Sequence, residues 1–346
     1  MTDEPEKTED ALDAAEKPDE PAPPMTPKLL ARLFVVPLLI VVMIVGCSLA
    51  VIVLFGWIST GREQSIEKLV QRIEAGTGEK LLDVAMLPKD REVWQAAADL
   101  ANRLQSESNQ LPPEERSRVA ARLGTVLEKS AKARQAEAGQ EMQQYLLVAL
   151  GRLGQPESVP VLVAYATDEA QPVGVRRNAL WALGLMKDVP AARQAWPQVA
   201  SVLDSPEPVL RLVAAATVGT LAERGDEAAV RALRRAYQSG DREVQWTTAI
   251  ALARLGDASP AALLKDMLSR AYWESVPVTP DPGERPEAQR RLPPDKVDEY
   301  LMDTIEAARN LGTPALRQKV ETLMQDASPQ VRDRANQALK GWPRES

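Results

Sequence analysis

The chain has 346 residues, which is enough to bury a sizeable core, and a formal net charge of −7. It contains no histidine and a single cysteine, Cys47. These counts exclude internal disulfides, cysteine nucleophiles outside that one position, most metal sites and acid–base catalysis by histidine. Aromatic residues make up only 4% of the chain, and the apolar residues are mainly Ala, Val and Leu. This composition favours closely packed helices over sheets.

The N-terminal 24 residues are strongly acidic. They hold nine Asp or Glu side chains and two lysines, and Pro and Ala fill most of the remainder. Such a segment buries too little apolar surface to offset the entropy lost on ordering, so the sequence predicts a disordered acidic tail over residues 1–28. Two roles stay open for it, a solvating tail or a docking segment for a basic partner.

An uncharged apolar stretch of 26 residues runs from Leu33 to Ile58. A helix of this length spans about 39 Å, which exceeds the roughly 30 Å hydrocarbon core of a bilayer. Arg32 precedes the stretch, and Trp57 and Arg62 mark its other end. The sequence predicts a single transmembrane anchor helix within residues 29–60 that contacts the lipid bilayer.

Cys47 lies inside this predicted anchor. The residues Ile44, Val45 and Gly46 before it resemble a bacterial lipobox, in which the cysteine would be lipidated after cleavage. The chain nevertheless stays apolar over residues 49–57, whereas a lipoprotein usually turns polar after its cysteine. The pattern favours an intact span, and lipidation of Cys47 remains the alternative.

The flanking charges do not decide the orientation of the anchor. Two basic residues lie close to its N-terminal side, and three lie close to its C-terminal side. A short charged segment before a signal anchor most often stays inside the cell, while the acidic tail argues the other way. We expect a single-pass membrane protein whose C-terminal domain lies outside the cytoplasm.

The remaining chain contains internal repeats. The segment 175–184 returns in degraded form at residues 210–219, 244–253 and 331–340, and residues 145–151 hold a partial copy upstream. A period of roughly 30 to 45 residues indicates stacked repeats. In the 175–184 copy, Val175, Ala179, Ala182, Leu183 and Met186 fall at helical spacing and form one apolar stripe.

A second apolar helix lies between successive copies, for example over residues 228–237. One helix pair of this size is too small to bury both stripes, whereas stacking pair on pair buries them in a continuous core. Small residues at the recurring positions let neighbouring helices approach closely. The sequence therefore predicts an all-α fold, an α-solenoid of about seven helix pairs over residues 61–346.

The repeats resemble HEAT repeats, and more narrowly the short HEAT-like repeats of phycobilisome lyases. The resemblance rests on repeat arginines, on Ala-Leu-Gly endings and on acids in the turns before the arginines: Arg176, Arg211, Arg332, Ala149, Ala182, Asp168, Asp204 and Asp326. It covers about residues 62–342, and Gln245 departs from it. The spacing of acid and arginine suits structural salt bridges across the stack, and anion binding is the alternative.

A proline-rich insertion interrupts the sixth pair over residues 274–295. Six prolines in so short a span exclude a continuous helix. Insertions into repeats gather on one face, often the binding face. We expect either a tolerated surface loop or a partner-contact element built from its basic residues and the aromatic pair at its base: Arg285, Arg290, Arg291, Tyr272 and Trp273.

The sequence offers no catalytic motif and no cofactor site. Phosphate-binding glycine loops and nucleophile elbows are absent, and Trp181, Trp196 and Trp246 fall at helical spacings that predict core positions. Residues 33–346 carry a charge of only −2, which is not the basic footprint of a nucleic-acid-binding protein.

These features together predict a non-catalytic, membrane-anchored scaffold that binds a protein partner. Two alternatives remain. One is a structural protein that organises the cell envelope. The other, which the resemblance to phycobilisome lyases implies, is a lyase or chaperone acting on a chromophore protein.

Overall fold

The computed structural model describes residues 65–76, 88–130, 137–238, 240–276 and 292–343, which belong to one compact unit beginning at Ser65. The predicted acidic tail and the predicted anchor, residues 1–60, lie outside the described residues. Among the helices that are described, none combines the length and the apolar character needed to cross a bilayer.

Every regular element in the described ranges is helical, and the α-helices form seven consecutive pairs. The first four pairs are α3 (Ile66–Gly76) with α4 (Pro88–Glu107), α5 (Pro113–Ser130) with α6 (Glu137–Leu153), α7 (Val159–Thr167) with α8 (Val173–Leu185), and α9 (Pro190–Gln194) plus α10 (Trp196–Ala200) with α11 (Pro208–Leu221).

The last three pairs are α12 (Glu227–Tyr237) with α13 (Arg242–Arg254), α14 (Ala261–Met267) plus α15 (Arg270–Ser275) with α16 (Pro294–Leu311), and α17 (Pro314–Thr322) with α18 (Pro329–Lys340). Short 3₁₀ helices connect them at η2 (Ser108–Gln110), η4 (Pro156–Ser158), η5 (Ser201–Asp204) and η6 (Leu323–Gln325). The observed pairing follows the predicted one.

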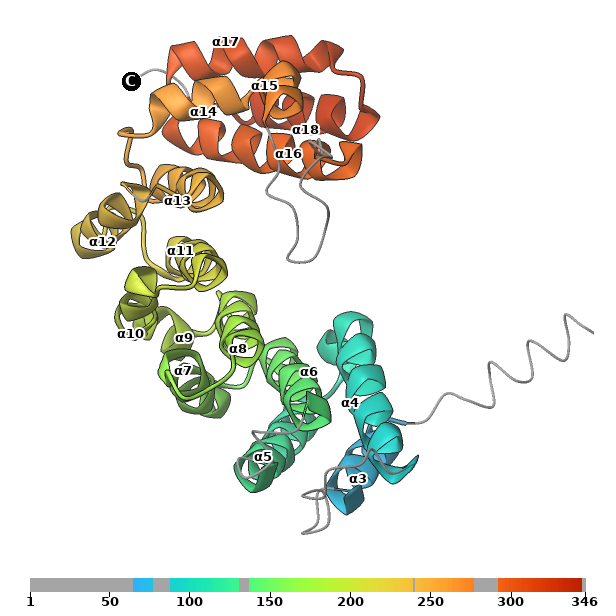
Figure 1. The fold of residues 1–346 in the computed structure, drawn as a ribbon. Helices are drawn as coiled ribbons and strands as arrows, with labels where there is room; N and C mark the ends of the chain where they lie inside the picture. The colour runs from blue at the N-terminus through green and yellow to red at the C-terminus, as the bar shows by residue number, and fades with distance from the viewer. Residues whose placement is uncertain (1–64, 77–87, 131–136, 239, 277–291, 344–346) are drawn as a thin grey trace, which may run out of the picture. The chain divides into compact units, whose positions relative to one another are not determined.

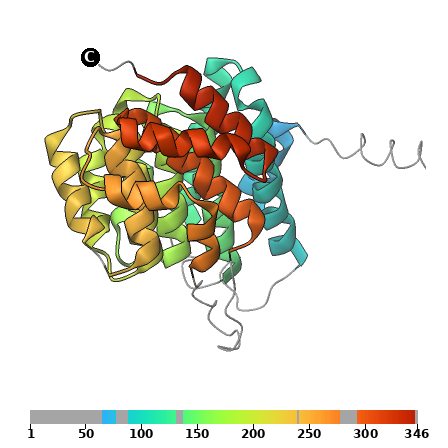
Figure 2. The ribbon, with the colours of Figure 1, turned by 90° about the horizontal axis from the view of Figure 1, so that it is seen from above.

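The second helix of each pair packs against the second helix of the next. In this way α4, α6, α8, α11, α13, α16 and α18 form one layer, which we call the second-helix layer (Figure 1). The first helix of each pair covers one side of this layer, as a view at right angles also shows (Figure 2). The opposite side of helices such as α8 and α11 is left open to solvent.

Local capping fixes where several helices begin and end. The carboxylate of Asp226 accepts hydrogen bonds from the backbone N–H groups of the first turn of α12, and Asp241 does the same for α13. Gly225 and Gly256 have φ values of 84° and 87°, which favour glycine, and they lie in the connections that follow α11 and α13.

Close contacts between small residues set the spacing within the second-helix layer. A Cβ atom added at Gly151 of α6 would lie 2.7 Å from the Cα of Ala182 in α8, and one added at Gly219 of α11 would lie 2.8 Å from the Cα of Ala251 in α13. The prediction that small residues let the repeats approach closely is confirmed at these two contacts.

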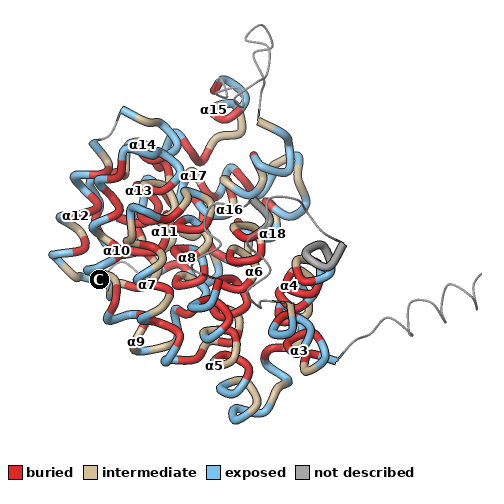
Figure 3. Tube along the Cα trace, turned by 60° about the horizontal axis from the view of Figure 1, so that its bottom comes forward, coloured by how far each residue is buried: buried red, intermediate tan, exposed pale blue. Residues whose placement is uncertain are grey.

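The core has two parts. The first runs from Ile66 to Leu255 and is mainly aliphatic, and the second runs from Trp246 to Trp342 and contains several aromatic rings. All five residues of the predicted apolar stripe on α8 are buried. Buried positions follow the helix sides that face other helices, while exposed positions gather at the ends and outer sides (Figure 3).

Candidate protein-binding surface

The two aromatic residues predicted as partner anchors at the base of the insertion, Tyr272 and Trp273, lie in α15. Trp273 is 0% exposed, and its indole Nε1 donates a hydrogen bond of 2.7 Å to the carbonyl oxygen of Met267. Its prediction as a contact residue is therefore wrong, because the ring is fully covered by its own domain. Tyr272 is half-buried, and its hydroxyl accepts a hydrogen bond of 2.8 Å from Nε1 of Trp246.

These rings belong to an aromatic cluster that joins three helices. Trp273 stacks on Tyr300 with ring centroids 4.6 Å apart and an interplanar angle of 8°. Trp246 meets Trp273 edge-to-face at 4.7 Å. Such pairs contribute roughly 0.5–1.5 kcal/mol each beyond the area they bury. The aromatic pair at the base of the insertion thus stabilises the sixth repeat. Arg285, Arg290 and Arg291 of the insertion lie outside the described residues.

The repeat arginines donate to backbone carbonyl groups of the turn that precedes their helix. Nε of the buried Arg176 lies 3.1 Å from the carbonyl oxygen of Ala166. Nη1 of Arg211 lies 2.9 Å from that of Ser205. The geometry gives these positions a structural role, in which a guanidinium satisfies the carbonyl oxygens left at a turn between two helices.

The turn acids have separate partners. The Asp168 carboxylate accepts hydrogen bonds from the backbone N–H of Ala170 at 3.0 Å and from Nε2 of Gln171 at 3.1 Å. Asp204 is exposed at the end of η5. These acids therefore shape or border their own turns.

In the last repeat, Asp326 uses its backbone and its side chain for different partners. Its carbonyl oxygen accepts from Nη1 of Arg332 at 2.7 Å, whereas its carboxylate accepts from Nε and Nη2 of Arg270 at 3.0 and 2.5 Å. Nη2 of Arg270 also donates to Asp298 at 2.6 Å. Here the predicted pairing of Asp326 with its own repeat arginine is replaced by an ion pair with Arg270 in the preceding repeat.

This charge network sits mostly out of solvent. Burial of the Asp326 carboxyl raises its pKa, whereas the hydrogen bonds from Arg270 and from the backbone of Ser328 lower it, and the net shift is downward. Sequence reasoning missed Arg270 because that residue lies outside the repeat motif. The described residues contain no group of three or more side chains suited to holding a metal ion.

The feature that stands out on the surface is apolar. Four of the five large hydrophobic residues that are exposed in the described ranges belong to α8 and α11: Val173, Trp181, Leu185 and Val209. Trp181 is 44% exposed and Leu185 is 40% exposed. The prediction of Trp181 as a core residue is wrong, because it lies on the helix side opposite the buried stripe that contains Ala179 and Ala182. Trp246 is buried as predicted, and Trp196 is half-buried.

The open side of α11 continues this patch. It carries an uncharged series at helical spacing, each member exposed or half-buried: Val209, Leu212, Val213, Ala216 and Thr220. We call these residues, together with Val173, Trp181 and Leu185, the α8–α11 surface. Contiguous apolar surface rimmed by polar groups is typical of protein interaction sites.

Charged groups border this surface on both sides. On the α6 side, the guanidinium of Arg152 lies 5.8 Å from the centre of the Trp181 ring, and Arg152 also donates to the carbonyl oxygen of Ala101. Burial lowers the pKa of Arg152. The tryptophan ring therefore contacts a partly desolvated cation on one face, and the side chain is still 44% exposed.

The α13 and α16 side is acidic. Desolvation by neighbouring helices, with a smaller effect of Asp241, raises the pKa of Glu243, and desolvation likewise raises the pKa of Asp303. Burial, followed by the charges of Glu243, Glu299 and Asp303, raises the pKa of Tyr300 to about 12. These acids lie close enough to act on one another around Tyr300, and α13 also carries a cation, Arg254, which lowers the pKa of Asp303 and donates a hydrogen bond of 3.4 Å to Oγ1 of Thr220 in the α8–α11 surface.

Comparison with known proteins agrees with the repeat architecture. A family model described as HEAT repeats matches residues 128–214 and 196–276. No curated protein sequence matches the chain.

Three solved structures are similar to the chain. The complex of CpcE and CpcF of phycocyanin lyase from a Nostoc species has 16% identity and a TM-score of 0.46, with 82% of this chain and 96% of that chain covered. A designed armadillo repeat protein in complex with a (KR)4 peptide has 14% identity and a TM-score of 0.39, with 81% and 100% covered. Human deoxyhypusine hydroxylase has 16% identity and a TM-score of 0.30, with 79% and 96% covered. The described part of the chain is a helical solenoid of HEAT-repeat character, and residues 128–276 carry the HEAT-repeat match.

Proposed function

We propose that this protein is a non-catalytic, membrane-anchored scaffold that binds a protein partner on the α8–α11 surface. The observation that carries the proposal is the concentration of exposed hydrophobic residues on that surface. Trp181 and Leu185 lie exposed on one side of a helix whose opposite side is fully buried. Leaving such residues in water costs free energy that burial against a partner recovers, at about 25 cal/mol per Å² of apolar area.

The flanking charges define the chemistry of the partner. Glu243 lies on α13 and Asp303 on α16, on the side of the repeats that follows α11, and desolvation raises the pKa of both carboxyl groups. A basic side chain placed beside them would favour the charged forms. The partner is therefore a protein segment that presents apolar side chains to α8 and α11 and basic side chains to the acidic region beside α13 and α16.

Site-specific photocrosslinking tests this assignment. A photoreactive amino acid replaces Trp181 in one variant and Met324 in the control, because Met324 is 37% exposed but lies in η6, away from the α8–α11 surface. We expect a discrete adduct from position 181 whose crosslinked peptide contains apolar residues flanked by Lys or Arg. Equal adducts at both positions, or a crosslinked peptide without basic residues, would overturn the proposal.

The proposed anchor rests on the uncharged stretch from Leu33 to Ile58 and its flanking residues. We place the helical repeats outside the cytoplasm. The Ser346→Cys variant tests this placement, since Cys47 is the only native cysteine and lies inside the stretch. Labelling of intact cells by a membrane-impermeant maleimide supports it. Labelling only after lysis places the repeats in the cytoplasm and contradicts it.

A further inference from the structure

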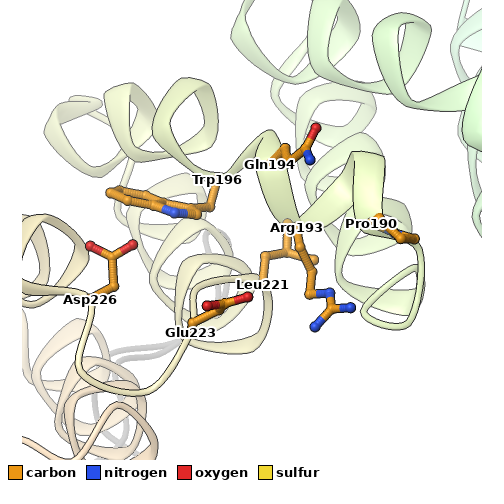
Figure 4. Close-up of a pocket in the computed structure, with 7 residues that line it drawn as sticks. All are labelled: Pro190, Arg193, Gln194, Trp196, Leu221, Glu223 and Asp226. Carbon is orange, nitrogen blue, oxygen red and sulfur yellow. The ribbon is translucent and has the colours of Figure 1, made fainter.

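A pocket lies where the fourth helix pair meets the fifth. It has a volume of about 260 Å³ and is formed by α9, the start of α10, the end of α11 and the turn before α12 (Figure 4). Its charged and aromatic residues are Arg193, Trp196, Glu223 and Asp226. Pockets for drug-sized ligands span roughly 300–1,000 Å³, so this one is sized for a single side chain or a small ion.

The next repeat contains an equivalent pocket of about 740 Å³. The equivalence follows from the sequence positions, since Asp188 and Asp226 each precede the first helix of their pair. Arg193 and Arg231 follow these acids by five residues, and Trp196 and Arg234 follow them by eight. At one of these matched lining positions, a tryptophan in the first pocket stands in place of an arginine in the second.

In the second pocket, Arg234 pairs with the acid of the following repeat. Its Nε and Nη2 donate to the two carboxylate oxygens of Asp257 at 2.6 and 2.9 Å. This hydrogen bonding lowers the pKa of Asp257, whose side chain is only 4% exposed. The pocket thus contains its own cation in a bidentate pair.

In the first pocket, the acid equivalent to Asp257 is Asp226. Its Oδ1 caps α12 through the backbone N–H groups of Ala228 and Ala229, at 2.9 and 3.1 Å. Within the described ranges, neither Asp226 nor Glu223 takes part in a salt bridge. Figure 4 shows the Trp196 ring beside the space in front of Asp226, and the guanidinium of Arg193 pointing away from Asp226.

We propose that this pocket binds the cationic side chain of a lysine or arginine from a protein partner. Trp196 supplies an aromatic face for the cation, and Asp226 and Glu223 supply the opposite charge. With Arg193 included, the lining carries two negative charges and one positive charge, so one added cation neutralises it. The inference rests on the proposed scaffold function only for the source of the side chain, because cation binding by the pocket is testable without any partner.

The test uses the full chain labelled with 5-fluorotryptophan and followed by fluorine NMR. The chain has seven tryptophans, and Trp→Phe variants assign their signals. The probe is N-acetyl-lysine methylamide, and the matched control is N-acetyl-norleucine methylamide, which has a similar aliphatic chain without the charge. We expect the lysine compound alone to shift the Trp196 signal in a saturable way, with the Trp181 signal unchanged. Equal shifts with both compounds, or no shift of Trp196 with either, would overturn the proposal.

Two variants sharpen the result. Asp226→Asn removes the charge but keeps a residue that caps helices well, and we expect it to weaken probe binding by roughly tenfold while α12 stays folded. Trp196→Arg introduces at this position the arginine that the next repeat has, so we expect calorimetry to detect no probe binding. Unchanged affinity in either variant contradicts the proposal. If the probe-binding experiments fail while photocrosslinking at position 181 gives a specific adduct, the cation site in the pocket is rejected and the proposed scaffold function is retained.

Discussion

The aromatic cluster around Trp273 and the α8–α11 surface around Trp181 use the same residue type in opposite ways. Trp273 is fully buried, stacked on Tyr300 and hydrogen bonded through its indole N–H. Trp181 is 44% exposed and contacts a cation on one face of its ring. The first arrangement stabilises the sixth repeat, whereas the second leaves apolar area available to another molecule. Exposure, and not residue type, therefore separates the structural tryptophan from the candidate binding residue.

The largest expected effect is on the buried side of this comparison. Trp273→Ala removes a ring that α13, α14 and α16 enclose, and we expect it to lower the free energy of unfolding by about 3–5 kcal/mol. Chemical denaturation followed by circular dichroism measures the change. The Trp181→Ala variant serves as the control in the same experiment, and equal losses in the two variants would erase the distinction between the two tryptophans.

The ion network beside Trp273 gives the next effect. Arg270→Met leaves Asp326 in a largely buried position without its cation, and we expect a loss of about 2 kcal/mol at neutral pH. Because the folded-state pKa of Asp326 lies below its ordinary value of 3.8, the stability from this pair is present above that value and is lost as the pH falls through the folded-state pKa. Unfolding curves at neutral and strongly acidic pH test this. A difference between wild type and variant that does not shrink in acid contradicts it.

The packing beneath Trp181 gives a smaller effect. Gly151→Ala places a methyl group 2.7 Å from the backbone of Ala182, so α6 and α8 must separate. We expect a loss of about 1–2 kcal/mol and a weaker contact between Arg152 and Trp181. Thermal unfolding reports the stability, and the assigned fluorine NMR signal of 5-fluorotryptophan at position 181 reports the contact. Gly124→Ala is the matched control, since a Cβ there meets no atom within 4 Å.

The smallest stability effect is expected at the surface itself. Trp181→Ala should lower the free energy of unfolding by only about 1 kcal/mol, because the side chain loses one cation–π contact and less buried area than the fully covered Trp273. Equilibrium denaturation detects a change of this size when the unfolding curves of wild type and variant are fitted with the same dependence of free energy on denaturant concentration. A loss above about 2 kcal/mol would show that Trp181 acts in folding.

Much of the fold was predictable because the repeat pattern is local. Apolar residues at helical spacing identified the stripe of Val175, Ala179, Ala182, Leu183 and Met186, and all five are buried. The small residues Gly151 and Gly219 marked close contacts for the same reason. Periodicity failed at Trp181, since a match to helical spacing does not by itself say which side of the helix faces the core. The offset of Trp181 from Ala179 and Ala182 contained that information.

The partners of charged residues were less predictable. Spacing along the chain brought the repeat arginines close to the turn acids, but the guanidinium groups bind carbonyl oxygens there. One of these acids, Asp326, does form an ion pair. Its partner is Arg270, which lies 56 residues earlier in the chain. Likewise, Trp273 lies in a helix of only six residues, too short to show a periodic pattern, and its burial depends on Trp246 and Tyr300 from neighbouring helices. Such contacts arise from tertiary packing.

The central claim is that the α8–α11 surface binds a protein segment. The most direct measurement compares the affinity of the crosslinked segment, made as a peptide, for three full-length variants: Trp181→Glu, Leu185→Glu and Met324→Glu. All three place a charge at an exposed hydrophobic position, so folding should be equally preserved. We predict that the first two weaken binding by about a hundredfold and that the third leaves it unchanged. Equal affinities in all three variants would contradict the claim.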